Sequence, residues 1–209
     1  MNGIMQNNSV ILAGEIVTEP VFSHETYGEK FYELTLAVRR LSGMQDLLPV
    51  SISQHLMTPE VKLGGRVTVS GQFRSYNKTV GDKSKLMLTV FARDVSPFDE
   101  SINPNTLHLS GYVCKTPVYR KTPFNREICD VLLAVNRQYG KSDYIPCIVW
   151  GRNARFAQTL CVGQRVCLSG RVQSRTYQKK LDEGIDVRTA YEVSVCKIDV
   201  EGQSDAAQA

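Results

Sequence analysis

The chain has 209 residues and a net charge of +4, a length that fits one or two domains. No apolar run approaches the roughly 20 residues of a membrane span, and the first residues, MNGIMQNNS, lack the basic and apolar regions of a signal peptide. We therefore expect a soluble, cytoplasmic protein with no membrane partner.

The first half of the chain predicts five short strands. Each is a run rich in β-branched and aromatic residues and bounded by turn residues. The runs are Val10–Val17, Phe31–Arg39, Leu47–Ser53, Arg66–Arg74 and Leu86–Val95. Between the third and the fourth lies His55–Leu63, in which Pro59 limits any helix to about one turn on each side.

The second half predicts the same order of elements. Its strands are Thr106–Val113, Ile128–Arg137, Tyr144–Trp150, Arg165–Arg175 and Tyr191–Val200. Between the third and the fourth, Arg152–Leu160 combines good helix formers with apolar residues near helical spacing, and Gly163 follows as a stop signal. Five strands and one helix are thus expected here.

The two halves are copies of one domain. A shift of 97 positions carries NSVILAGEIVTEPV (residues 8–21) onto NTLHLSGYVCKTPV (residues 105–118) and Arg40 onto Arg137. A shift of 99 then carries Ser70 and Gly71 onto Ser169 and Gly170. A repeat of this length indicates a duplicated domain. Residues 1–104 are called the first copy below, and residues 105–209 the second copy.

Glycines inside the strands indicate that each copy bends into a small barrel, because a glycine in a strand commonly marks a bulge or a sharp bend. They are Gly14, Gly71, Gly111 and Gly170. Pro49 and Pro146 remove ladder donors, so the third strand should have a bulge or a free edge there. Five strands with a helix between the third and the fourth describe an OB-fold, which binds oligonucleotides or oligosaccharides.

We therefore expect an all-β chain with two tandem OB-folds, each a five-stranded Greek-key barrel with a short helix between strands 3 and 4. The expected domains are residues 1–100, a divergent and accessory OB-fold, and residues 101–201, the principal binding domain. A short flexible tail, residues 202–209, should follow.

The residues that could carry metal or catalytic chemistry are scattered. All six cysteines lie in the second copy without a C-x-x-C pair, so we expect them to be small apolar core residues. His24, His55 and His108 form no metal motif, and neither a phosphate-binding loop nor a nucleophile elbow occurs. We expect no metal, no cofactor and no enzymatic activity.

Charge separates the copies. The first copy contains ten Lys and Arg against eleven Asp and Glu, whereas the second copy contains fifteen against ten. The positive excess suggests a polyanion as the partner of the second copy.

Rings and cations interleave on one face of the second copy. Alternation puts Tyr144, Ile148 and Trp150 on one side of the third strand, with Ile145, Cys147 and Val149 in the core. In the fourth strand, Val166, Leu168 and Val172 should point inward, and Arg165, Arg171, Gln173 and Arg175 outward; Tyr177, Gln178, Lys179 and Lys180 follow. Such a face suits a single nucleic-acid strand, because bases stack on rings while cations follow the phosphates.

These residues resemble a known family. The pattern N-x-x-x-L-x-G…P…L-A-V-N-R…V-W-G-R-N-A…G-Q-R-V…S-G-R-V-Q-S-R-x-Y, from Asn105 to Tyr177, is similar to the bacterial single-stranded DNA-binding protein (SSB) family. The first copy resembles it more weakly, through framework residues. The chain would thus be a tandem form of that family.

The resemblance implies which residues bind nucleic acid. In the family four aromatic positions stack bases, and the motif places Tyr139, Tyr144, Trp150 and Tyr177 on them. The cations expected beside them are Arg137, Arg152, Arg171, Arg175, Lys179 and Lys180. The first copy has Ser42, Leu47 and Ser53 instead of rings and keeps Tyr76, with Arg74 and Lys78 beside it. Phosphates could also meet Arg39, Arg40, Lys83 and Lys85.

The resemblance also implies an assembly. Family members typically carry one OB-fold and form tetramers, so two folds per chain predict a homodimer, in which a closed two-fold assembly covers an exposed strand edge. The family usually ends in a flexible tail with an acidic tip that recruits replication and repair proteins. This sequence ends in EGQSDAAQA, so we do not expect recruitment through such a tail.

The leading hypothesis is sequence-independent binding of single-stranded DNA in replication, recombination or repair, at the nucleoid in the cytoplasm. One alternative is an OB-fold module of a primosome-like complex that mainly contacts other proteins. Another is a single-stranded RNA binder, because RNA offers the same bases and phosphates.

Overall fold

The structure, a computed structural model, describes residues 7–81, 83–181 and 184–201, with the side chains of all of these except 80, 83, 179–181, 184 and 185. Within this part of the chain it contains twelve strands, one α-helix and two short 3-10 turns, so the protein is all-β as expected. The residues form two compact units. The N-terminal unit comprises residues 10–106 and 172–192, and the C-terminal unit comprises residues 7–9, 107–171 and 193–201. The domain boundaries expected from the repeat stay a prediction.

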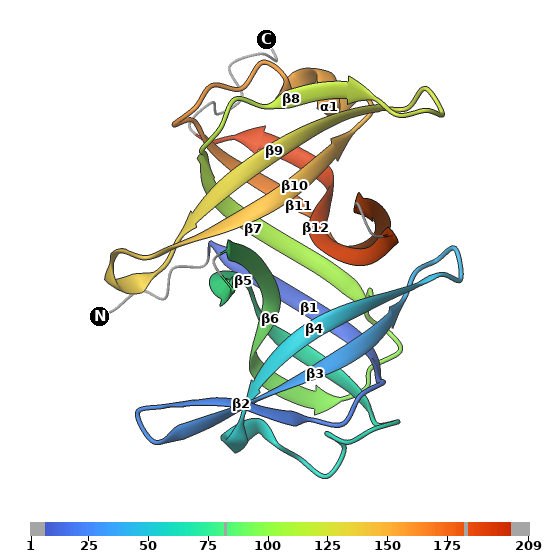
Figure 1. Ribbon diagram of the computed structural model, residues 1–209, viewed down its shortest axis with the longest axis vertical. Coiled ribbons are helices and arrows are strands. Elements are labelled where there is room, and N and C mark those ends of the chain that lie inside the picture. Colours follow the sequence, from blue (N-terminus) through green and yellow to red (C-terminus); the bar gives the residue numbers. More distant parts are fainter. Residues whose placement is uncertain (1–6, 82, 182–183, 202–209) are drawn as a thin grey trace. The chain divides into compact units, whose positions relative to one another are not determined.

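The N-terminal unit contains a closed barrel, visible in blue to green in Figure 1. Its strands are β1 (Asn8–Ile16), β2 (Val21–Thr26), β3 (Glu29–Arg39), β4 (Gln45–Ser53), β5 (Arg66–Val80) and β6 (Lys83–Pro97). They lie in the order β2-β3-β4-β6-β5-β1, and β1 also pairs with β3, which closes a five-stranded barrel with β2 attached at its edge. β4 and β6 run parallel to each other. The 3-10 turn η1 (Gln54–Leu56) follows β4, within the one turn that Pro59 permits.

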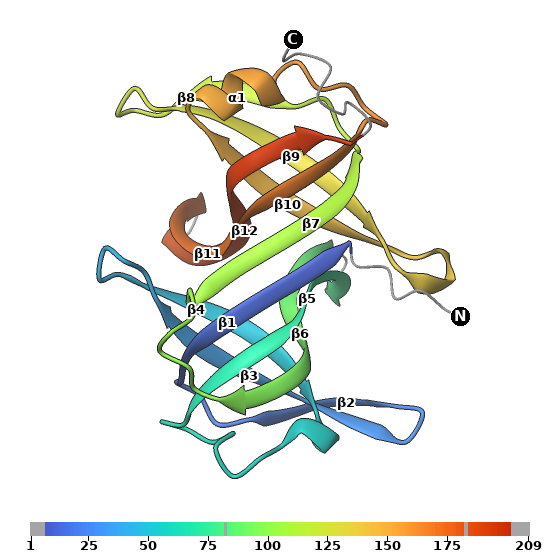
Figure 2. The same ribbon diagram turned by 180° about the vertical axis from the view of Figure 1, so that it is seen from behind.

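The C-terminal unit repeats this barrel, as both views show (Figures 1 and 2). Its elements are β7 (Asn105–Val113), β8 (Val118–Lys121), β9 (Glu127–Asn136), η2 (Gln138–Gly140), β10 (Ser142–Trp150), α1 (Arg152–Ala157), β11 (Arg165–Leu181) and β12 (Gly184–Val200). The order is β7-β11-β12-β10-β9-β8, β7 also pairs with β9, and β10 runs parallel to β12. The helix expected between the third and fourth strands is present. A closed five-stranded barrel with this connectivity is the OB-fold.

The strand glycines let neighbouring backbones approach closely. A Cβ atom at Gly14 would collide with the carbonyl oxygen of Ala37 on β3, and one at Gly71 with that of Phe91 on β6. The pairing of β5 with β6 shifts register between Ser70 and Gly71, which is the β-bulge that the glycine predicted. Gly111 and Gly170 lie equally close to backbone carbonyls of neighbouring strands.

The alternation of the strands fills the two barrels. Ile145, Cys147 and Val149 are at most 1% exposed, so the core assigned to the third strand of the second copy is confirmed. Val166, Leu168 and Val172 are buried as well, as expected for the fourth strand. Phe73, Leu12, Leu36 and Leu48 belong to the fully buried side chains of the first copy.

Two features differ from the expectation. β2 and β8 are additional strands that were not predicted. Every residue of β2 is exposed, so it has no buried face that would produce a period-two pattern in the sequence. The prolines of the third strands cause no register shift: the parallel ladder of β4 begins at Val50, directly after Pro49, and that of β10 at Cys147, directly after Pro146. Before each parallel ladder begins, the edge of the strand tolerates a residue without an N–H group. Of the two features expected at these prolines, the structure therefore shows the free edge and not the bulge.

Candidate nucleic-acid interface

The outer face of the C-terminal unit carries a row of aromatic rings. Strand pairing places Tyr144 of β10 opposite Ala134 of β9, and Ala134 opposite Tyr112 of β7. Directly paired residues point to the same side of a sheet, so the two rings flank a methyl group at a separation of two strand spacings, about 10 Å. Tyr144 is 48% exposed and Tyr112 is 38% exposed. Arg165, the partner of Tyr112 on β11, has its guanidinium carbon 5.9 Å from the centre of that ring.

Tyr112 was missing from the residues expected at the interface. Its exposure follows from the alternation of β7, but only the pairing of β7 with β9 brings it beside Tyr144. One signal in the sequence points to it: under the shift of 97 positions, Tyr112 takes the place of Glu15. The second copy therefore has a ring where the first copy has a carboxylate.

Trp150 continues the face that begins at Tyr144. It is the last residue of β10, shares the side of Tyr144 by alternation, and is half-buried directly before Gly151 and α1. Ile148 lies between them on the same side but is buried, so the rings do not form an uninterrupted exposed stripe. The two expected stacking positions of β10 thus present two separate surfaces.

Tyr139 projects from the turn between β9 and β10. Its backbone adopts a left-handed conformation with a φ of 63°, which is uncommon for a residue with a side chain, and the side chain is 95% exposed. The turn is closed by the Arg137 N–H group, which donates to the Lys141 carbonyl oxygen at 2.7 Å. A strained turn that holds an apolar ring in solvent fits a group that stacks on a ligand.

The expected cations of this unit have different surroundings. The Nε atom of Arg137 lies 3.4 Å from a carboxylate oxygen of Asp143, which is fully buried. The charge of Arg137 is therefore already balanced in part by a framework residue. Arg152, at the start of α1, and Arg171, on β11, are exposed. Of these three arginines, the latter two are the more accessible to a phosphate.

The distal part of the β11–β12 hairpin carries Tyr177 and Arg175, which belong to the N-terminal unit. The guanidinium carbon of Arg175 lies 5.6 Å from the centre of the Tyr177 ring, and its Nε atom lies 3.6 Å from the Glu192 carboxylate. The expectation that Gln173 points into solvent is wrong. It is 7% exposed, because its amide donates to the buried Glu192 carboxylate at 2.8 Å. The side chains of Lys179 and Lys180 lie outside the described part of the chain.

Ser174 fixes this hairpin within the N-terminal unit. Its N–H group donates to a carboxylate oxygen of Asp46 at 2.8 Å, and its hydroxyl oxygen accepts the Leu47 N–H at 3.2 Å. Asp46 is fully buried and also binds Arg40, whose Nη2 lies 2.5 Å from its Oδ1. The hydrogen bond to Asp46, together with its charge, raises the pKa of Arg40 against the effect of burial. Arg40, expected as a possible phosphate contact, is thus part of the framework.

This ion pair is present in both copies. The shift of 97 positions that relates Arg40 to Arg137 also relates Asp46 to Asp143, and both carboxylates are fully buried. The sequence contains one signal for this ion pair, because both copies have an aspartate at the same repeat position.

Three of the residues expected to bind nucleic acid on the first copy lie on β5. Tyr76 is 41% exposed, Lys78 is exposed, and half-buried Arg74 donates two hydrogen bonds to the Gln72 side-chain oxygen, at 3.2 and 2.7 Å. Burial, and to a smaller degree the charge of Glu33, raises the pKa of Tyr76. Arg39 and Lys85 are exposed, whereas the side chain of Lys83 lies outside the described residues.

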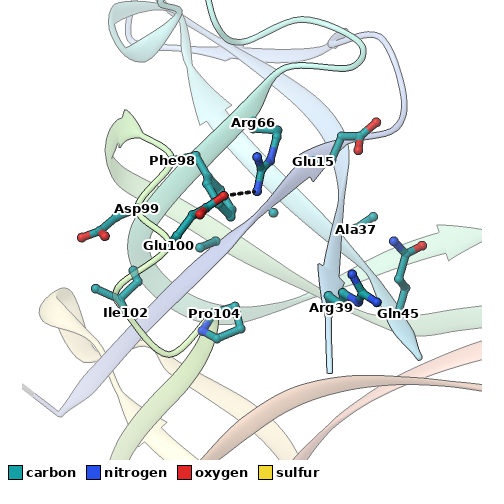
Figure 3. Close-up of a pocket in the computed structure, with 12 residues that line it drawn as sticks. Glu15, Ala37, Arg39, Gln45, Arg66, Phe98, Asp99, Glu100, Ile102 and Pro104 are labelled. Atoms are coloured by element: carbon teal, nitrogen blue, oxygen red, sulfur yellow. Dashed lines mark hydrogen bonds and ion pairs between the residues drawn. The ribbon is translucent and has the colours of Figure 1, made fainter. Parts of the chain in front are cut away.

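A pocket of about 560 Å³ opens on the first copy (Figure 3). Arg66 stands over the Phe98 ring, with its guanidinium carbon 3.7 Å from the ring centre, and its Nη2 lies 3.3 Å from the Glu100 carboxylate. The charged lining residues are Glu15, Arg39, Arg66, Asp99 and Glu100. Three acidic groups against two basic ones leave no positive excess, so this pocket does not suit a phosphate backbone.

The cysteines only partly match the expected core role. Cys129 and Cys147 are buried, and burial raises the pKa of the Cys129 thiol to about 11. Cys161 and Cys196 are exposed, so the expectation is wrong for these two. Among the described residues, no group of three or more His, Cys, Asp and Glu side chains is arranged to hold a metal ion. In the same part of the chain, no helix is long and apolar enough to cross a membrane.

Comparison with known proteins gives one consistent result. Residues 104–200 match the model of the Single-strand binding protein family. The chain is 33% identical over 90 residues to single-stranded DNA-binding protein B of Bacillus subtilis, a match that covers 40% of this chain and 78% of that protein. It is 34% identical over 83 residues to the single-stranded DNA-binding protein of Clostridium tetani, covering 36% of this chain and 57% of that protein.

A solved structure shares the fold over nearly the whole chain. The crystal structure of a deletion mutant of the single-stranded DNA binding protein from Thermus aquaticus aligns with a TM-score of 0.70 and 18% identity. The alignment covers 97% of this chain and 98% of that one. At this identity the likeness concerns the fold alone.

Proposed function

Because the chain belongs to the single-strand binding protein family, we propose that it binds single-stranded DNA without sequence preference and has no enzymatic activity. Bases stack on the exposed rings, and exposed arginines contact phosphates. The observation that carries the proposal is the row formed by Tyr144, Ala134 and Tyr112 on the outer face of the OB-fold in the C-terminal unit.

This row suits stacking for a physical reason. The small Ala134 side chain leaves the inner edges of both rings accessible. Arg165 lies beside Tyr112, and its Nε atom also pairs with the Glu201 carboxylate at 2.9 Å. Every base has an apolar face, so rings bind single strands with little dependence on sequence. Tyr139 adds a ring on a turn, where it can follow a strand that leaves the sheet.

The wider role follows from this activity. A protein that covers unpaired strands would protect them during replication, recombination or repair, in the cytoplasm at the nucleoid. We also propose that the chain forms a homodimer and so supplies four OB-folds to one assembly. Sedimentation equilibrium would show twice the chain mass, and a monomer at micromolar concentration would contradict this part of the proposal.

The test is affinity for an oligo-dT strand. Tyr144→Ala and Trp150→Ala should each weaken binding by roughly 1–3 kcal/mol, since each removes one stacking surface. Phe98→Ala is the matched control, because Phe98 lines the pocket of the first copy, whose lining has no positive excess and does not suit a phosphate backbone. Circular dichroism confirms that the variants fold. The stacking assignment fails if Tyr144→Ala binds as tightly as Phe98→Ala.

Three further outcomes separate the alternatives. Quenching of the single Trp150 by oligo-dT supports stacking, and an unchanged emission speaks against it. Competition between matched DNA and RNA strands tells which backbone is preferred. Failure to bind any bare strand, together with capture of a purified replication protein, would favour a protein-interaction module.

A further inference from the structure

The outer face of the N-terminal unit carries a group of rings and arginines, of which only Arg74 was expected from the sequence to bind nucleic acid. We call it the Phe91 cluster and define it as His24, Phe31, Gln72, Arg74, Phe91 and Arg93. These residues come from β2, β3, β5 and β6, all within the N-terminal unit. Its arginines and Phe91 lie on the fourth and fifth barrel strands, β5 and β6, beside the face of strands 2 and 3 that OB-folds use for oligonucleotides.

Two arginines converge on the Phe91 ring. The guanidinium carbon of Arg74 lies 4.0 Å from the ring centre, and that of Arg93 lies 5.5 Å from it. Both arginines donate to the same oxygen of the Gln72 amide, Arg74 at 2.7 Å and Arg93 at 3.3 Å. The two positive groups thus share a neutral acceptor. Their mutual repulsion would be relieved by an anion that bridges them, and a phosphate can accept from both.

The ring contacts extend from Phe91 toward the edge of the sheet. The rings of Phe91 and Phe31 lie 5.8 Å apart, and His24 stacks on Phe31 at 5.0 Å with an angle of 11° between the planes. Phe31 is buried beneath these neighbours, at 8% exposure, and Phe91 is half-buried, whereas His24 and Arg93 are exposed. Phe91 pairs with Ser51 on β4, and Ser51 pairs with Glu33 on β3, so the acidic side chain of this row lies two strands away from Phe91. The positive charge is therefore on the β5–β6 side of the ring.

The cluster does not belong to the common framework of the two copies. Phe91 pairs with Ser51, and the equivalent pair in the second copy is Ile148 with Ser194, so Ser194 replaces the ring. Under the shift of 99 positions, Gln173 replaces Arg74. The second barrel therefore folds without these residues, so the fold alone does not explain their presence in the first copy.

We propose that the Phe91 cluster is a second binding site for single-stranded DNA, built by the first copy from residues of its own. A base stacks on the Phe91 and Arg74 pair, and the adjoining phosphate bridges Arg74 and Arg93. The site rests on the proposed function, because it engages a further stretch of a strand that the second copy already holds. The first copy lacks three of the four expected stacking rings of the second copy, keeps Tyr76, and has the Phe91 cluster in addition.

The experiment compares short and long strands. The double variant Phe91→Leu and Arg93→Gln keeps an apolar side chain at the sheet and removes the ring and one cation. Its control, Phe98→Leu with Arg66→Gln, removes a ring and a cation that also lie against each other, from the pocket of the first copy that does not suit a phosphate backbone. Binding is measured with dT strands of about 10 and about 35 nucleotides, since one OB-fold occupies about 4–16 nucleotides.

The Phe91 cluster variant should bind the long strand about tenfold more weakly than the wild type and bind the short strand unchanged. Its salt dependence on the long strand should also become shallower by about 0.7 in the log–log slope, because one phosphate contact is lost. The control should match the wild type on both strands. The proposal is overturned if the cluster variant behaves like the control on the long strand, or if it weakens both strands equally. Failure of the wild type to bind either strand would instead refute the proposed function itself.

Discussion

Replacing Asp46 by alanine should strongly destabilise the protein. The carboxylate is fully buried, binds Arg40 at 2.5 Å and accepts the Ser174 N–H at 2.8 Å. Its removal leaves Arg40 without its partner and Ser174 without an acceptor. Breaking a fully buried ion pair costs about 3–5 kcal/mol, and an unsatisfied buried donor about 1–3 kcal/mol. Because the Arg40 side chain is 28% exposed and water compensates it in part, we expect about 3 kcal/mol in total.

Urea unfolding monitored by circular dichroism measures this loss. Asp46→Asn keeps an oxygen that can accept from Ser174 and should therefore lose about 1–2 kcal/mol, less than the alanine variant. Asp130→Ala is the matched control, since the pair of Asp130 with Arg120 has a similar distance of 2.6 Å but is 40% and 48% exposed. An exposed pair of this kind contributes about 0–1 kcal/mol. If Asp46→Ala lost no more stability than Asp130→Ala, the reasoning from burial would be refuted.

Two further predictions concern single side chains. A thiol reagent at neutral pH should modify Cys161 and Cys196 quickly and leave Cys129 unmodified until the protein unfolds, because burial raises its pKa to about 11. Peptide mapping after labelling reads this out, and rapid labelling of Cys129 in the folded protein would contradict it. Gly14→Ala should cost about 1–3 kcal/mol in urea unfolding, since its Cβ would meet the Ala37 carbonyl oxygen of the neighbouring strand. Ser9→Ala, at an exposed position of the same strand, is the control, and equal stability of the two variants would count against close backbone packing at Gly14.

The main strands could be read from the sequence because their signals are local. Alternation at period two identified the buried side chains of β10, and the glycines indicated where the barrels bend. β2 escaped this pattern because every one of its residues is exposed. Where both faces of a strand meet water, nothing in the order of residues marks its two sides.

Contacts between distant residues could not be read in this way. Gln173 was expected in solvent because its strand alternates, yet its amide binds Glu192, which follows nineteen positions later on the neighbouring strand. Tyr112 gained its place beside Tyr144 only through the pairing of β7 with β9 and of β9 with β10. Such contacts depend on the register between strands and on closure of the barrel, and neither can be read from the order of residues.

The duplication, the all-β OB-fold and the predicted set of rings and cations on the second copy could be read from the sequence, since repeats, alternation and residue type do not depend on how strands pair. Only the folded chain shows which of these groups are neighbours. In the fold, Arg40 and Arg137 each pair with a buried aspartate, and residues of four strands come together in the Phe91 cluster. The physical reason is that hydrogen-bonded pairing fixes which side chains of separate strands become neighbours, and charge and stacking act only between neighbours.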